Sequence, residues 1–159
     1  MHFIGIDPGF TGAVAVLDAD GCIVALDDAP AVTVQSGKRK RSEFDRPAMV
    51  RLLRFYEPSL TRVAIEKVTP MPKQGIASTS RFMAGWGMWL GILACLQLPH
   101  ELVTPQRWKR AMLAGQPKEK DASRQVAQAM WPDADLHLVK HHGRADALLI
   151  AEWLRRQVK

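Results

Sequence analysis

The chain has 159 residues, of which 47% are hydrophobic and 24% are charged, and both values are typical of a globular protein. A chain of this length can bury a core of its own, so we expect residues 1–159 to form a single domain. The formal net charge of +6 favours a polyanionic partner, although basicity alone indicates attraction and not specificity. The apolar stretch 83–96 has only 14 residues. A membrane span needs about 20, so we expect a buried helix there and no membrane segment.

Two further features concern the compartment. Cys22 and Cys95 lie in apolar runs and show neither a metal-binding spacing nor a disulfide framework. We therefore expect buried thiols in a reducing compartment. Met1 leads directly into an apolar strand rather than into the pattern of a signal peptide. Both features favour a cytoplasmic protein.

Three consecutive strands are predicted at the start of the chain. The first is the apolar run that ends in Asp7-Pro8-Gly9, and the second and third are 13–18 and 22–27. The linking Asp20-Gly21 is a hairpin signal, because glycine accepts the positive φ that such turns require.

A polar segment and a helix follow. Residues 33–46 are polar and carry the basic run Lys38-Arg39-Lys40-Arg41, and we expect a mobile loop. Asp45 is a suitable N-cap for a helix with Pro47 in its first turn, and Pro58 should stop this helix.

The second half of the chain alternates strands with helices. The run 62–66 is predicted as the fourth strand and 101–103 as the fifth, whereas 69–75 is rich in proline and glycine and predicts irregular backbone. Helices are predicted over 78–96, 105–113, 121–131 and 143–158. Gly87 and Gly91 leave one stripe of the first of these helices without side chains, which would allow another backbone to approach closely. The order of elements indicates an α/β fold, a mixed sheet with helices on its faces.

Three acidic residues occupy unusual places. Asp7 and Glu66 each end an apolar strand, and Asp146 lies inside the last predicted helix. Burying a carboxylate at the end of a core strand is costly unless a cation meets it. Several such acids suggest a divalent metal, because hard oxygen ligands suit Mg²⁺ or Mn²⁺. In a basic chain, such a metal site would act on phosphate.

A histidine could complete this set. His142 and Asp146 are four residues apart and share a helix face, and neutral imidazole is a competent metal ligand. His141 could be the ligand instead, or His142 could cap the helix.

Each acid also has a purely structural interpretation. Asp7 could be a turn residue before Pro-Gly. Alternative ion pairs are available for the other two acids: Glu66 with Lys67 or Arg62, and Asp146 with Arg144 or Lys140.

Four segments carry a resemblance to a known family. They are Gly5-Ile6-Asp7-Pro8-Gly9, Ala64-Ile65-Glu66, Thr104-Pro105-x-x-Trp108-Lys109 and His142-Gly143-Arg144-Ala145-Asp146-Ala147-Leu148. In this order they resemble a RuvC-type Holliday junction resolvase, more narrowly the phage and plant-chloroplast branch, within the ribonuclease H-like superfamily. The resemblance spans nearly the whole chain and implies a ribonuclease H-like mixed five-stranded sheet flanked by helices.

This resemblance implies a homodimeric, Mg²⁺-dependent endonuclease that nicks two opposed strands of a four-way DNA junction in recombination or branched-DNA processing. The setting would be a bacterial or phage-infected cell, and Mn²⁺ is expected to substitute for Mg²⁺. Two ions would be held in each site, with Asp7 on both, Glu66 on one, and His142 and Asp146 on the other.

The resemblance also extends to basic residues. Lys109 and Lys120 occupy places where the family carries lysines near the scissile phosphate, and they could stabilise developing negative charge. Their alternative is a solvated helix face. The residues expected to contact DNA are Lys38, Arg39, Lys40 and Arg41 in the polar loop, and Lys73, Gln74 and Arg81 beside the fourth strand. The alternative for the basic run is a disordered, solubilising loop.

Three other functions share features with this sequence. An actin-like or sugar-kinase phosphotransferase shares the Gly-Ile-Asp-x-Gly pattern but needs two large domains, for which this chain is too short. An RNA-processing nuclease of the same fold would use the same acids. A non-catalytic module that binds branched DNA would not need all three acids. The sequence favours the resolvase.

Overall fold

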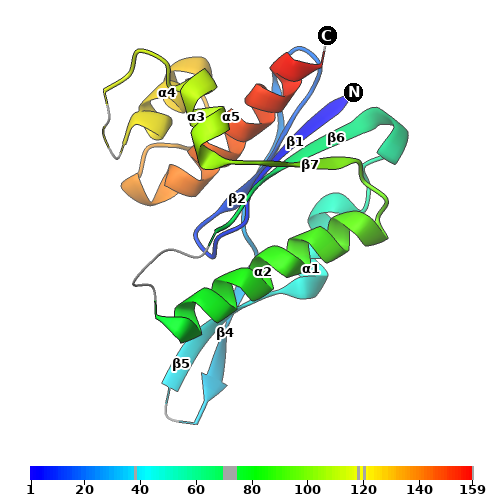
Figure 1. Ribbon diagram of the computed structural model, residues 1–159, viewed down its shortest axis with the longest axis vertical. Coiled ribbons are helices and arrows are strands. Elements are labelled where there is room, and N and C mark those ends of the chain that lie inside the picture. The colour runs from blue at the N-terminus through cyan, green and yellow to red at the C-terminus, as the bar shows by residue number, and fades with distance from the viewer. Residues whose placement is uncertain (38, 70–74, 118, 120, 159) are drawn as a thin grey trace.

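The structure is a computed structural model that describes residues 1–37, 39–69, 75–117, 119 and 121–158 (Figure 1). Its centre is a five-stranded mixed sheet in the order β3-β2-β1-β6-β7. The strands are β1 (His2–Asp7), β2 (Ala13–Leu17), β3 (Ile23–Asp28), β6 (Thr61–Glu66) and β7 (His100–Val103). β1 pairs antiparallel with β2 and parallel with β6, which in turn runs parallel to β7. The predicted five-stranded α/β fold is therefore confirmed.

Helices cover both faces of this sheet (Figure 1). The helices are α1 (Arg46–Leu53), α2 (Ile76–Cys95), α3 (Pro105–Met112), α4 (Ala122–Met130) and α5 (His142–Gln157). α5 lies along β1 and β2, with α3 and α4 packed against it, whereas α1 and α2 form the other layer. A short 3-10 turn, η1 (Pro58–Leu60), precedes β6, and another, η2 (Val139–His141), precedes α5.

The strands contribute side chains to the core on both faces of the sheet, because successive side chains alternate between the two faces. Phe3 is buried in the cluster that contains Leu148 of α5. Ile4 and Ile6 are buried in the other cluster, together with Trp89 of α2. By the same alternation, the last residue of β1 is directed to the α5 side of the sheet.

Two glycines let α5 lie very close to the sheet. A β-carbon on Gly5 would collide with the backbone of Ala147 and Ala151, and one on Gly143 would collide with the carbonyl of Thr11. Larger side chains at either position would push the helix away from β1 and from the turn after it. This close packing brings the first turns of α5 to the end of β1.

A hairpin replaces the loop that was predicted over residues 33–46. β4 (Ala31–Ser36) and β5 (Arg39–Phe44) pair antiparallel, from Ala31 opposite Phe44 to Ser36 opposite Arg39. The mobile-loop prediction is therefore wrong: β5 is too polar to indicate a strand from its sequence, but its backbone ladder with β4 holds it in place. The base of the hairpin joins the core, where Phe44 is buried.

The remaining differences are local. Asp45 caps α1 as predicted and accepts a hydrogen bond from the Ala48 N–H at 3.0 Å, but the helix ends at Leu53, well before Pro58. Cys22 and Cys95 are both exposed, so the prediction of buried thiols is wrong. Among the described residues, no helix combines the length and the apolar character needed to cross a membrane.

Candidate functional site

The structure brings the three predicted acids to one edge of the sheet. Asp7 ends β1 and Glu66 ends β6, and the parallel register between these strands, with Ile6 opposite Ile65, places the two acids at the same edge. Asp146 approaches from the second turn of α5. Three carboxylates therefore converge from two strands and one helix.

Asp7 is the most perturbed of the three. Burial raises the pKa of Asp7 from its ordinary value of 3.8 to about 7, and the charges of Asp146 and Glu66 add to the increase. The Gly9 N–H donates a hydrogen bond to Asp7 Oδ1 at 3.2 Å and opposes the shift only weakly. This carboxyl would gain strongly from a cation beside it.

The pKa values of the other two acids are also raised, in each case chiefly by burial. Lys109 counteracts the increase at Asp146, with its Nζ 4.0 Å from Asp146 Oδ2. The Lys109 side chain is 45% exposed, so solvent screens much of this attraction. The local negative charge is therefore only partly compensated by protein groups.

Two tryptophans hold the end of β6. Trp108 of α3 is fully buried, and its indole N–H donates a hydrogen bond to Glu66 Oε2 at 2.7 Å. The indole N–H of Trp86 on α2 donates to the Glu66 carbonyl at 3.1 Å. The side chain and the backbone of Glu66 are thus fixed from opposite layers of the fold. Trp108 belongs to the motif Thr104-Pro105-x-x-Trp108-Lys109, but this motif does not predict the hydrogen bond to Glu66.

The donor set fits a divalent cation. Its ligands are hard carboxylate oxygens, and Asp146 Oδ1 is buried without a hydrogen-bond partner among the described residues. In the described part of the chain, no three acidic, histidine or cysteine side chains are close enough to form a ready-made coordination shell. Cation binding would therefore require small side-chain movements, and it would compensate for the burial and the repulsion that raise the pKa of Asp7.

The two adjacent histidines have different surroundings. His142 is exposed at the start of α5, and its charge lowers the pKa of Asp146. His141 is buried, with Nδ1 3.5 Å from Asp135 Oδ1 on the other side of the helix start. Of the two imidazoles, His142 is the one placed to act together with Asp146.

Two solved structures share this architecture. Over 99% of its length the chain superposes on Thermus thermophilus RuvC, with a TM-score of 0.59 at 18% identity and 96% of that chain covered. A second match is T. thermophilus RuvC in complex with Holliday junction substrate, with a TM-score of 0.60 at 16% identity and 92% of that chain covered. The chain has the RuvC fold.

A relative by sequence is similar over half of the chain. Holliday junction resolvase MOC1, chloroplastic, of Chlamydomonas reinhardtii is 36% identical over 85 residues, which are 52% of this chain. The chain spans only about a tenth of the length of that relative, since the match covers 10% of it. No protein-family model matches the chain.

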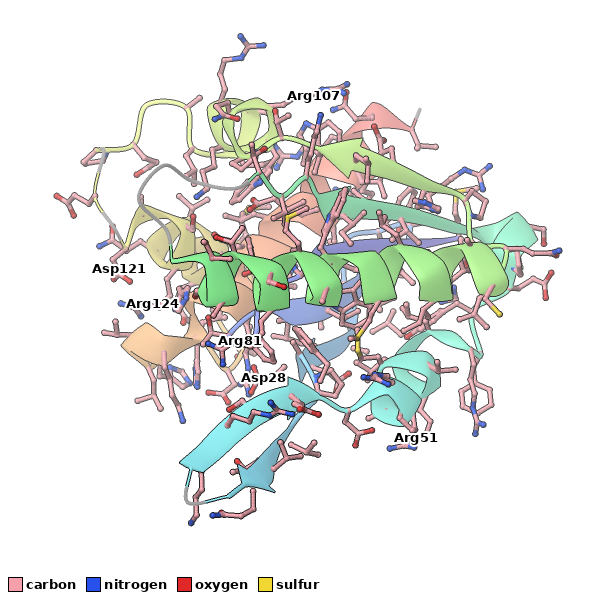
Figure 2. The ribbon with its side chains drawn as sticks, turned by 60° about the horizontal axis from the view of Figure 1, so that its bottom comes forward. Asp28, Arg51, Arg81, Arg107, Asp121 and Arg124 are labelled. Carbon is pink, nitrogen blue, oxygen red and sulfur yellow. The ribbon has the colours of Figure 1, made fainter. Side chains whose placement is uncertain are left out.

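The ion pairs considered above as alternative roles for Glu66 and Asp146 do not occur among the described contacts. Arg144 pairs with Asp28 (labelled in Figure 2) and with Asp135, each at 2.6 Å, and not with Asp146. Arg62 donates instead to the carbonyl of its neighbour Thr61.

The other predicted site residues are only partly described. Lys38, Lys73, Gln74 and Lys120 lie outside the described residues, and of Arg39 only the backbone, in β5, is described. Lys40 and Arg41 of β5 and Arg81 of α2 are exposed and line one hollow of about 510 Å³. Among the described lysines of this set, Lys109 lies beside the carboxylates.

Asp7→Asn should stabilise the metal-free protein at alkaline pH. Because the folded-state pKa of Asp7 is raised, the folded protein binds more protons than the unfolded chain between about pH 4 and 7, and stability falls as pH rises through this window. Asparagine avoids this loss, which is on the order of 2–4 kcal/mol. We expect a thermal midpoint higher by roughly 5–10 °C at about pH 8. The difference should vanish near pH 4, and an equal difference at both pH values would contradict the assignment.

Trp108→Phe should weaken the binding of Mn²⁺. The change removes the N–H that orients Glu66 Oε2 and that lowers the pKa of this acid. Loss of such an outer-shell hydrogen bond costs about 10- to 100-fold in metal affinity. Titration calorimetry would measure it, with Trp153→Phe as a control because Trp153 is an equally buried tryptophan on α5. Equal affinities in both variants would show that the hydrogen bond has no such role.

Proposed function

We propose that this chain is a structure-selective endodeoxyribonuclease, formed by one nuclease domain over residues 1–159, that resolves four-way DNA junctions by paired metal-dependent nicks. Recombination or other processing of branched DNA would be its context. The observation that carries the proposal is the convergence of Asp7, Glu66 and Asp146, with the pKa of Asp7 near 7. The RuvC fold and the identity to a segment of Holliday junction resolvase MOC1 support it. A bacterial or phage-infected cell is the proposed setting, although that relative is chloroplastic.

Two Mg²⁺ ions, replaceable by Mn²⁺, are the proposed cofactors. Asp7 would contact both ions, Glu66 one, and His142 and Asp146 the other. When bound, such ions supply an activated water and charge stabilisation for an in-line displacement at phosphorus. Lys109 would hold the reacting phosphate and stabilise its developing negative charge. We propose the same role for Lys120.

Basic residues outside this edge would hold the DNA itself. Lys38, Arg39, Lys40 and Arg41 of the hairpin, together with Lys73, Gln74 and Arg81, are proposed to contact its backbone. Such contacts position the duplex without reading its sequence.

Paired nicks in opposed strands require two related sites, so we propose a homodimer with a two-fold axis. α2 supports this proposal. Its exposed side carries Ala84, Gly87, Gly91 and Cys95, and the space around both glycines is open. Beside this side lies an apolar hollow of about 260 Å³ between α1 and α2. A second copy could approach closely along such a small-residue face.

Gly87→Leu should weaken this dimer. Among the described residues, no atom outside the neighbouring part of α2 lies within 4 Å of a β-carbon at Gly87, so leucine is compatible with the fold of one protomer but would obstruct a partner helix. Light scattering should show a shift from dimer to monomer. Ala129→Leu, at an exposed position of α4 in the other helical layer, is the matched control and should stay dimeric. A monomeric wild-type protein that still makes paired nicks would contradict the proposal.

Two alternatives share the same features: an RNA-processing nuclease of this fold, and a non-catalytic module that binds branched DNA. Purified protein would be incubated in Mg²⁺ with labelled four-way junction, duplex, flap and RNA–DNA hybrid substrates. The proposal predicts preferential cutting of the junction. Preferential cutting of the hybrid would favour the RNA enzyme, and tight junction binding without cutting would favour the module.

A further inference from the structure

A groove separates the β4–β5 hairpin from the first half of α2. It encloses about 510 Å³ and is lined by Phe10, Lys40, Arg41, Ser42, Ser78, Arg81 and Phe82. A second hollow of about 190 Å³ shares Phe10, Arg41, Ser42 and Arg81 with the first and extends it toward Met88. Figure 2 shows Arg81 on the side of α2 that is turned toward the hairpin.

The two walls of this groove carry positive charge. Lys40 and Arg41 lie on the hairpin wall and Arg81 on the helix wall, and all three are exposed. Arg41 has one acidic neighbour, Glu43, at 2.6 Å. Cations on both sides of a narrow groove suit a chain of phosphates that runs between them.

The floor carries a preformed aromatic surface. Phe10 stacks on Phe44 with a ring separation of 4.1 Å and an angle of 13° between the rings. Phe44 is buried, whereas Phe10 is only half-buried and lines the groove. The stack on Phe44 holds the Phe10 ring in place. A flat group that packs on the groove side of this ring would therefore cost little further side-chain entropy. Bases of single strands stack on aromatic side chains in this way, whereas the bases of an intact duplex are covered by their neighbours.

The groove starts beside the carboxylates. Phe82 Cε2 and Asp7 Oδ1 both lie within 4 Å of the point where a β-carbon of Gly9 would be. A strand in the groove therefore continues directly to the edge of the sheet where the acids converge.

We propose that this groove binds an unpaired nucleotide of the DNA strand that enters the carboxylate site, with its base stacked on Phe10 and its phosphates held by Lys40, Arg41 and Arg81. The proposal rests on the proposed function only in taking DNA as the substrate. It assigns to the hairpin and α2 the selection of DNA that has lost local base pairing.

The test compares a short oligothymidylate with an oligomer of equal length whose central residues are abasic, by fluorescence anisotropy in EDTA. Wild-type protein should bind oligothymidylate roughly 5- to 100-fold more tightly for one stacked base. Phe10→Leu should lose this preference and keep its affinity for the abasic oligomer, whereas Phe10→Tyr, which retains a flat ring, should preserve the preference. Arg81→Gln should weaken binding of both oligomers equally and reduce the salt slope by about 0.7. Arg51→Gln, an exposed cation on α1 (labelled in Figure 2), should change neither.

Three results would overturn the proposal: no preference in the wild-type protein, an unchanged preference in Phe10→Leu, or equally effective competition by polyglutamate of the same charge. The outcome is separable from the proposed function. Junction cutting without a base preference would refute the groove alone, whereas a base preference without junction cutting would refute the nuclease alone.

Discussion

Asp7→Asn is expected to reduce junction cleavage on the order of 1,000-fold or more while junction binding stays nearly unchanged. Asparagine keeps the shape of the side chain and can still accept the hydrogen bond from the Gly9 N–H, but it lacks the charge proposed to hold both ions. Several kilocalories per mole of lost transition-state stabilisation correspond to this change in rate. Single-turnover cleavage and an electrophoretic binding assay measure the two quantities separately.

The control for this variant is Asp133→Asn, which removes an exposed acid from the segment between α4 and α5. It should cut at the wild-type rate. Cleavage by Asp7→Asn within a few-fold of wild type would show that the converging acids are not the metal site.

His142→Ala should reduce the cleavage rate by more than about 100-fold, because loss of a metal ligand should exceed the 10- to 100-fold cost of an outer-shell contact. His141→Ala should leave the rate within a few-fold and instead lower the thermal midpoint, because it empties a buried position beside Asp135. His142→Asp should recover part of the Mg²⁺-dependent rate, since carboxylate oxygen suits that ion. Rates and melting curves of the three variants provide the comparison.

Equal losses of rate from the two alanine variants would contradict the separation of the histidines. A large loss of rate confined to His141→Ala would move the ligand role to that residue. His141 ends η2 and is buried, whereas His142 begins α5 and is exposed, so the two imidazoles do not face the same acid.

The positions of the acids could be predicted because they depend on local patterns. Asp7 and Glu66 each end a short apolar run, and parallel neighbouring strands bring such ends to one edge. The four-residue spacing of His142 and Asp146 relies only on helix geometry. The order of the five sheet strands also agrees with an opening meander followed by crossover connections.

Other features depend on tertiary packing and have no comparable signal. The hydrogen bond from Trp108 to Glu66 joins residues 42 positions apart in the chain. β5 is polar apart from Phe44, so this half of the hairpin resembles a loop in composition. The apolar neighbours of Cys22 and Cys95 do not reveal that both thiols are exposed, one just before β3 and the other at the end of α2.

The groove between the hairpin and α2 likewise could not be predicted from the sequence. Its basic residues were predicted to contact DNA, but as parts of a mobile loop and of a separate helix. Only the fold brings Lys40 and Arg41 opposite Arg81 and places Phe10 between them.

The most direct test of the central proposal is to map the cuts in a four-way junction whose four strands are labelled in turn, with Mg²⁺ present. We expect nicks at equivalent positions in two opposed strands, none in EDTA, and products that DNA ligase seals without further processing. Mg²⁺-independent cutting, cuts scattered over all four strands, or an uncut junction would contradict it.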